Sequence, residues 1–285
     1  MIDLKALTDI PPWEWPRNTA ARLHQALTDA AATNSDRLVA AGLAGNCTVM
    51  NDQLAEDLLR IANHAGEPEE LRAQAAISFG PVLETADMSE FDDPEEVPVT
   101  EKMFHKIQRS LQNIYSDTNV PKLVRRRTLE AAVRAPEDWH RAAVGTAYAS
   151  GDQDWKLTAV FAMRFIRGFD DQILEALKNT DAEIHFQAVM AAGSWGIKAA
   201  WPHVLGLIRE PDTGKDLLIA AIEAAGSIRP QEAVEIIGGL IDSEDEDIAD
   251  AASEAMAMAR GELATDEDDE EFDEDEDDEE GDWVN

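Results

Sequence analysis

Apolar side chains recur along almost the whole chain at the spacing of α-helices, and the alternation typical of β-strands is nearly absent. Seven segments share one template, with mostly apolar or small residues at a first position and again four and eight residues later. This spacing puts the three side chains on one helical face. The sequence therefore predicts seven similar amphipathic helices, with first positions at Asp36, Leu71, Val124, Trp155, Ile184, Leu217 and Ile248.

The same template predicts how these helices pack. Four residues after the first position the side chain is nearly always alanine, which lets a neighbouring helix approach closely. Nine residues after the first position glycine is frequent, which fits a close contact or an approaching helix end. The third and fourth segments depart from this pattern, with Thr128, Val133 and Arg164 where Ala or Gly is usual, so we expect looser packing or an altered surface there.

The segments recur at intervals of about 30 residues, and a second amphipathic pattern precedes each of them, such as Phe104, Ile107, Leu111 and Ile114. Paired helices at this period predict an α-solenoid. One interval is longer and contains an acidic, proline-containing stretch, which we interpret as a loop insertion over residues 84–100.

The second helices, such as those in 181–196 and 216–228, resemble the HEAT-repeat family and most closely its short phycobilisome-lyase-like subtype. The resemblance implies an all-α fold, a right-handed α-solenoid of about seven helix pairs over residues 19–260. Residues 1–18, with two tryptophans between prolines, are expected to form an N-terminal cap segment, because end repeats need a cover for their apolar face.

Charge changes this picture at the C-terminus. The chain has 59 acidic and 24 basic side chains, a formal charge of −35, and residues 265–285 hold 15 acidic and no basic ones. Such a segment cannot bury enough apolar surface to fold, so we expect a disordered acidic tail over 261–285. Phe272, Trp283 and Val284 interrupt the acidic run and are candidate tail contacts. The acidic charge of the rest of the chain has an alternative explanation, which is a solvated surface adapted to a saline cytoplasm.

Enzyme signatures are mostly missing. The single cysteine, Cys47, excludes a multi-cysteine metal site, and none of the common catalytic or nucleotide-binding motifs occurs. The HEAT resemblance extends to di-iron hydroxylases built around His-Glu pairs, but none of the six histidines is followed by glutamate. We therefore expect no catalysis, no metal and no cofactor, and a lyase-like HEAT-repeat activity is the enzyme alternative.

One stretch is locally basic, since residues 122–167 hold nine basic and five acidic side chains. The HEAT resemblance implies that second helices line the concave side of the solenoid. Arginine and tryptophan are favoured at binding hot spots, although a solvated helix face balanced by acidic neighbours is an open alternative. The candidate partner-binding residues are Arg125, Arg126, Arg127, Arg134, Arg164, Arg167 and Trp195.

These observations predict a non-catalytic protein-interaction scaffold or adaptor, which binds a protein partner of unknown identity on its concave face and is modulated by the acidic tail. A second hypothesis is an acidic client-holder or nucleic-acid mimic that sequesters a basic protein. The net charge argues against direct binding of nucleic acid or an anionic membrane surface. No segment has the length of a signal peptide core or a membrane helix, so we expect a soluble, cytoplasmic protein.

Overall fold

The computed structural model describes residues 4–89, 91 and 97–268, with side chains described as far as residue 261. All regular structure in these ranges is helical, with fifteen α-helices and four short 3-10 helices. No helix in the described ranges is both long and apolar enough to cross a membrane. The chain divides into two compact units, Met1–Gly168 and Phe169–Asn285, which are considered separately.

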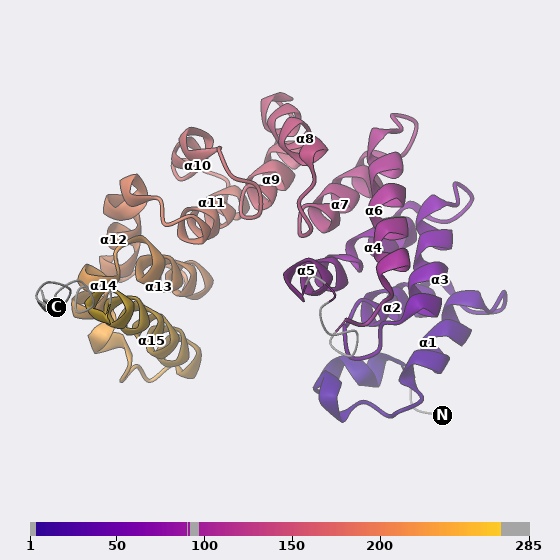
Figure 1. The fold of residues 1–285 in the computed structure, drawn as a ribbon, viewed down its shortest axis with the longest axis horizontal. Helices are drawn as coiled ribbons and strands as arrows, with labels where there is room; N and C mark the ends of the chain where they lie inside the picture. The colour runs from indigo at the N-terminus through magenta and orange to yellow at the C-terminus, as the bar shows by residue number, and fades with distance from the viewer. Residues whose placement is uncertain (1–3, 90, 92–96, 269–285) are drawn as a thin grey trace, which may run out of the picture. The chain divides into compact units, whose positions relative to one another are not determined.

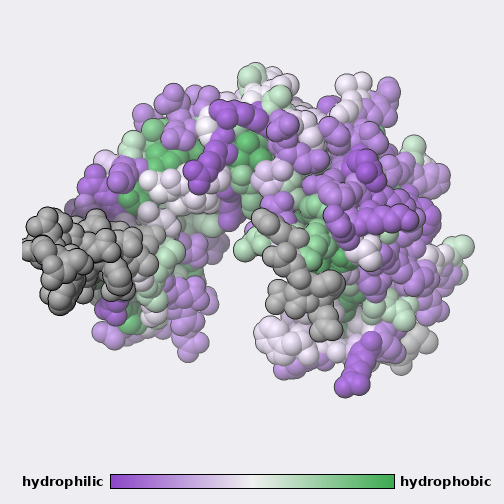
Figure 2. Space-filling model, viewed as in Figure 1, coloured by the Kyte–Doolittle hydropathy of each residue, from purple (hydrophilic) through white to green (hydrophobic). Residues whose placement is uncertain are grey.

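The first unit is built from helix pairs that stack on one another (Figure 1). Each pair packs a first helix against a second helix (α1 with α2, α3 with α4, α6 with α7, α8 with α9), and the second helices α2, α4, α7 and α9 contact one another in that order. The exposed side of the first helices α3 and α6 is mostly hydrophilic (Figure 2). The elements are η1 (Leu4–Asp9), η2 (Pro12–Glu14), α1 (Thr19–Thr28), α2 (Asn34–Ala44), α3 (Asp52–Asn63), α4 (Glu69–Ile77), α5 (Gly80–Ser89), α6 (Glu101–Ser116), α7 (Lys122–Ala132), α8 (Asp138–Ala149) and α9 (Gln153–Ala162).

The second unit repeats the arrangement with three pairs, α10 with α11, α12 with α13 and α14 with α15, and its second helices α11, α13 and α15 contact one another in order. Its elements are α10 (Asp170–Ala176), α11 (Ala182–Ser194), η3 (Lys198–Ala200), α12 (Trp201–Arg209), α13 (Lys215–Ile228), α14 (Pro230–Ile237), η4 (Gly238–Leu240) and α15 (Glu246–Asp268).

The seven template segments coincide with the seven second helices, which confirms the predicted pairing of helices. The small residue four positions into each template is fully buried in every case (Ala40, Ala75, Thr128, Ala159, Ala188, Ala221 and Ala252). The third segment accommodates its threonine because the Thr128 hydroxyl donates to the carbonyl oxygen of Val124, 2.8 Å away. The departure from alanine therefore leaves no unpaired hydroxyl in the core.

The glycine nine residues after the first position marks the closest approach of neighbouring second helices. A Cβ atom on Gly45 would lie 2.7 Å from the carbonyl oxygen of Ser78, and one on Gly193 would lie 2.9 Å from both Cα and Cβ of Ala224. Real Cβ atoms do not come this close to other atoms. The close packing predicted for this position is confirmed.

Two predicted boundaries differ from the structure. Helix α5 (Gly80–Ser89) extends into the loop expected over 84–100, and it buries Val82, Leu83 and Ala86 at helical spacing against the core of the first unit. The tail expected to be disordered over 261–285 begins inside α15, which continues to Asp268. The rest of that tail lies outside the described residues.

The N-terminal segment, expected to cap the first helix pair, contains the two 3-10 helices η1 and η2. η1 packs against α2 and buries Leu7. The indole nitrogen of Trp15 donates to the carbonyl oxygens of Leu7 and Ile10, at 3.0 and 3.1 Å. Trp13, in contrast, is 80% exposed.

Candidate partner-binding surface

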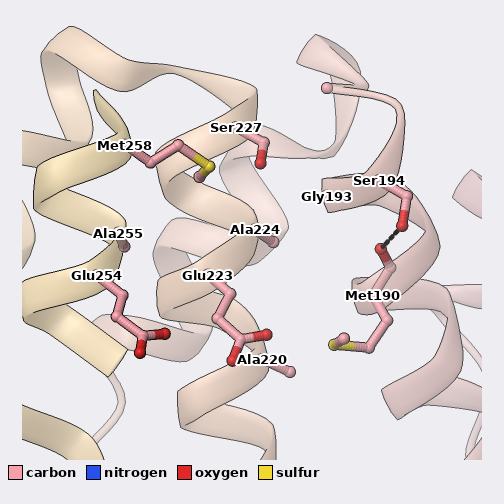
Figure 3. A pocket seen from close by; sticks show the side chains of 11 residues that line it. Met190, Gly193, Ser194, Ala220, Glu223, Ala224, Ser227, Glu254, Ala255 and Met258 are labelled. Carbon is pink, nitrogen blue, oxygen red and sulfur yellow. Dashed lines mark hydrogen bonds between the residues drawn. The ribbon is translucent and has the colours of Figure 1, made fainter. Parts of the chain in front are cut away.

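A groove runs across the second helices of the second unit (Figure 3). It has a volume of about 520 Å³, which is in the range of ligand and peptide sites in proteins. All three second helices, α11, α13 and α15, contribute side chains to it. The lining residues are Met190, Gly193, Ser194, Gly196, Ala220, Glu223, Ala224, Ser227, Glu254, Ala255 and Met258.

The repeat register explains why these residues meet. Six residues after the first template position, α11, α13 and α15 carry Met190, Glu223 and Glu254. Ten residues after it the three helices carry Ser194, Ser227 and Met258. Positions six and ten lie one helical turn apart on one face, beside the buried face at positions zero, four and eight. We call the surface formed by positions six and ten of the second helices the lining face.

Small residues form the floor of the groove. Ala220, Ala224 and Ala255 are buried beneath it, and Gly193 brings α11 close to α13. Because these side chains are short, the longer side chains at positions six and ten stand above a shallow trough. The hydroxyl of Ser194 is already used, since it donates to the carbonyl oxygen of Met190 at 3.0 Å (Figure 3).

Two carboxylates give the groove its charge. Glu223 and Glu254 are exposed, lie at the same level of α13 and α15, and extend in the same direction in Figure 3. Two methionines, Met190 and the 42% exposed Met258, add flexible apolar surface. The lining thus combines two carboxylates and two serine hydroxyls with short and flexible apolar side chains.

The arginines predicted to bind a partner lie in the first unit, and most of them have partners within it. Arg125 donates from Nε to the carbonyl oxygen of Tyr115 at 2.8 Å, and its guanidinium lies over the rings of Tyr115 and Trp155. The equivalent arginine of the second pair, Arg72, donates in the same way to the carbonyl of Ala62 at 3.0 Å. This arginine is therefore a repeated link between the end of a first helix and its second helix.

Arg126 and Arg127 belong to a buried polar network between α7 and α9. Arg126 donates from Nε to the Thr158 hydroxyl at 2.9 Å, and that hydroxyl donates to Glu130 at 2.6 Å. Arg127 pairs with the other oxygen of Glu130 at 2.6 Å, and Arg126 also pairs with Asp154 at 3.1 Å. Because Glu130 is only 5% exposed, its carboxylate oxygens depend on these hydrogen-bond donors in the core.

The structure brings two of the other candidates together. Arg134 and Arg164 both lie over the rings of Phe161 and Phe165, with guanidinium carbons 5.3–5.8 Å from the ring centroids. Arg134 also forms an ion pair with Glu84 of α5. Arg134, Phe161 and Phe165 occupy positions six and ten of their templates, so they belong to the lining face of the first unit.

Arg167 and Trp195 are the remaining candidates among the described residues. Arg167 is exposed near the end of the first unit, and Trp195 is half-buried after α11 in the second. Phe272, Trp283 and Val284 lie outside the described residues. The groove glutamates were missed from the sequence because the repeat pattern was compared only at buried positions; comparing positions six and ten would have found them.

Three histidines that are buried or half-buried contact other groups of the chain. His140 accepts the backbone N–H of Glu137 at Nδ1, 2.8 Å away, and burial lowers its pKa to about 4. His185 and His203 contact each other through their Nε2 atoms at 2.7 Å, and burial lowers the pKa of both. In the described part of the chain, no group of three or more His, Cys, Asp or Glu side chains could hold a metal ion.

Comparison with known proteins gives similarity of fold only. No family model and no curated protein matches the sequence. Among solved structures, YibA of E. coli is 14% identical, with a TM-score of 0.47 over 97% of this chain and 94% of its own. Human deoxyhypusine hydroxylase in complex with glycerol is 15% identical, with a TM-score of 0.39 over 90% of this chain and 88% of its own. An engineered protein is 17% identical, with a TM-score of 0.41 over 74% of this chain and 98% of its own.

YibA and the hydroxylase are HEAT-like helical repeat proteins. The prediction that the chain is not an enzyme rested on the missing motifs, and it is contradicted by this comparison, because an enzyme stands among the similar structures. At 15% identity the likeness concerns the fold and does not establish catalysis in this chain.

Proposed function

We propose that the chain is a protein-interaction scaffold that works in the cytoplasm, built as a right-handed α-solenoid of about seven HEAT-like helix pairs of the short phycobilisome-lyase-like kind. A protein partner binds along the lining face of the second helices. The acidic tail modulates this binding. Seven successive helix pairs, each with its second helix against the next within its unit, support the solenoid.

The observation that carries the proposal is the groove across α11, α13 and α15. Three successive repeats supply equivalent positions to one trough, so the surface is a product of the repeat itself. Extended concave surfaces of this kind are what repeat proteins use for binding. The exposed methionines and carboxylates of the groove support the proposal, since apolar surface bordered by polar residues is common at interaction sites.

The first unit contributes differently. Its arginines Arg125 and Arg126 hold neighbouring helices together, Arg127 pairs with Glu130 of its own helix, and Arg134 is paired with Glu84. These contacts favour a supporting role for most of the basic stretch. We therefore place the principal contact with a partner on the second unit.

Site-directed photo-crosslinking in cells tests the proposal. A photoreactive phenylalanine analogue is placed at position 194 or 227 in the groove, and a matched one at the exposed Glu235 on the first helix α14. We expect a discrete crosslinked protein from positions 194 and 227 and none from 235. Crosslinks of equal yield at all three positions, or only at 235, would contradict the proposal.

A further inference from the structure

Two imidazoles form a contact between successive helix pairs of the second unit. His185 of α11 and His203 of α12 approach each other through their Nε2 atoms at 2.7 Å, with ring centroids 4.9 Å apart. Both side chains are half-buried. Because α11 belongs to the fifth helix pair and α12 to the sixth, two titratable groups connect one repeat to the next.

The number of protons in this contact is limited. A neutral imidazole carries one N–H, so the hydrogen bond requires opposite tautomers, one ring donating from Nε2 and the other accepting at Nε2. One additional proton fits on Nδ1 of the donating ring without changing the contact. A second additional proton must go to the accepting Nε2, which places two N–H groups and two positive charges face to face.

We propose that the contact between His185 and His203 is a pH-sensitive switch between the fifth and sixth helix pairs, closed at neutral pH and opened when both imidazoles are protonated. The sixth pair includes α13, which packs against α11 and lines the groove with it. The switch concerns the second unit itself and does not depend on which protein the groove binds.

The surroundings of the pair disfavour positive charge. Burial lowers the pKa of both histidines, and the charge of His185 lowers the pKa of His203 further. Both side chains also lie near the start of their helices, since α11 begins at Ala182 and α12 at Trp201. The positive end of a helix dipole opposes a positive charge there. The folded unit therefore keeps the pair neutral at pH values where a free histidine is already protonated.

The charged groups around the pair do not compensate for two protons. Asp181, one turn before His185, caps α11 and accepts from the backbone N–H groups of Glu183 and Ile184 at 3.0 and 3.2 Å. In the described part of the chain, no carboxylate or ammonium group shifts the pKa of either histidine. The charged residues on these two helices and on the elements packed against them are Asp170, Asp171 and Glu175 of α10, Asp181 and Glu183 of α11, Lys198 of η3, Arg209 of α12, and Lys215, Asp216 and Glu223 of α13.

Proton uptake on opening sets the size of the effect. An exposed histidine has a pKa of about 6.5, and both histidines of the closed pair have lower values. Between these values each histidine binds one more proton in the open state than in the closed state. The closed contact is thus stable above pH 6.5, and below it the opening constant increases about 10-fold per pH unit for each histidine, or about 100-fold for the pair.

The tautomers of the full-length protein give the first test. Long-range ¹H–¹⁵N NMR spectra of the imidazoles at pH 7.5 distinguish protonation at Nδ1 from protonation at Nε2, and the variants His185→Gln and His203→Gln assign the signals. We expect opposite tautomers for the two histidines, with both titrating below the ordinary histidine range. The same tautomer in both rings would show that the contact does not form in solution and would overturn the inference.

Hydrogen exchange of the amides in α11 and α12 gives the second test, measured from pH 7.5 to pH 5 and corrected for the intrinsic exchange rate at each pH. Below pH 6.5 we expect the opening constant to increase about 100-fold per pH unit in the wild type and about 10-fold or less in His185→Gln. The double variant His185→Gln/His203→Gln should show no such increase. The control His64→Gln, which replaces an exposed histidine of the first unit, should behave as the wild type.

Circular dichroism at pH 7.5 establishes that each variant is folded. An opening constant of the wild type that does not change with pH would overturn the inference, as would equal pH dependence in the wild type and the double variant. If the double variant does not fold, the tautomers and the pH dependence of the wild type decide.

Discussion

Gly193 is a point of close contact between α11 and α13, and replacing it with alanine gives a sharp test of the packing. The added Cβ would lie 2.9 Å from both Cα and Cβ of Ala224. Backbone atoms are among the contacts, so the clash cannot be relieved by rotating a side chain. Insertion of a methyl group into a packed core costs about 1–3 kcal/mol.

The higher helix propensity of alanine partly offsets this loss of stability. Alanine is favoured over glycine inside a helix by about 1 kcal/mol. Gly206 in α12 supplies the matched control, because a Cβ there would have no neighbour within 4 Å. We expect Gly206→Ala to stabilise the protein by about 0.5–1 kcal/mol. Gly193→Ala should destabilise it by about 1 kcal/mol, the difference between the clash and the gain in helix propensity.

Thermal unfolding followed by circular dichroism and tryptophan fluorescence measures both variants. For a unit of about 100 residues, 1 kcal/mol shifts the Tm by about 4–8 °C. Trp195 and Trp201 lie in the second unit, and Trp139 and Trp155 lie in the first, so the fluorescence signal contains the transitions of both units, which can unfold separately in a repeat protein. A Gly193→Ala variant as stable as Gly206→Ala would refute the close approach of α11 and α13.

Three further outcomes are expected. The pKa of His140 is about 4 in the folded chain and near 6.5 in the unfolded chain. The unfolded chain therefore binds the proton first as the pH decreases. The free energy of unfolding should fall below pH 6.5, by about 2 kcal/mol between pH 7 and pH 5. His140→Asn, whose amide oxygen can replace Nδ1 as acceptor, should reduce this loss in urea titrations at the two pH values, and an unchanged pH slope would contradict the assignment. Thr158→Val removes the hydroxyl that donates to the buried Glu130 and should cost about 1–3 kcal/mol in urea unfolding, whereas a loss below 0.5 kcal/mol would show that the network is dispensable. Trp15→Phe loses the two indole hydrogen bonds of the N-terminal segment and should increase proteolysis of residues 1–18, while an unchanged cleavage rate would argue against their role.

The helices and their pairing were predictable because the repeat places small side chains at buried positions. Every template residue at position four is buried, and glycine at position nine marks the close contacts. Helix α5 was missed for a physical reason. Its apolar residues Val82, Leu83 and Ala86 have helical spacing, but an acidic stretch with prolines, which is typical of a loop, follows them directly.

The roles of the arginines could not be predicted in the same way. Periodicity places a side chain on a face of its own helix, but the partner comes from another repeat. Arg134 pairs with Glu84, fifty residues earlier in the chain, and Arg126 with Asp154 in the next pair. A local count of charges over 122–167 contains neither the acidic residues of α5 nor the pairing across repeats, so it overstated how much positive charge is available to a partner.

The most direct test of the account is to fill the groove and measure the loss of the bound protein. With the photoreactive analogue at position 194, Ser227→Trp places a large side chain in the trough, and Gln231→Trp on the exposed side of α14 is the control. We expect the crosslinked protein to disappear with Ser227→Trp and to persist with Gln231→Trp. A crosslink that persists unchanged with Ser227→Trp would contradict the assignment of this groove as the partner-binding surface.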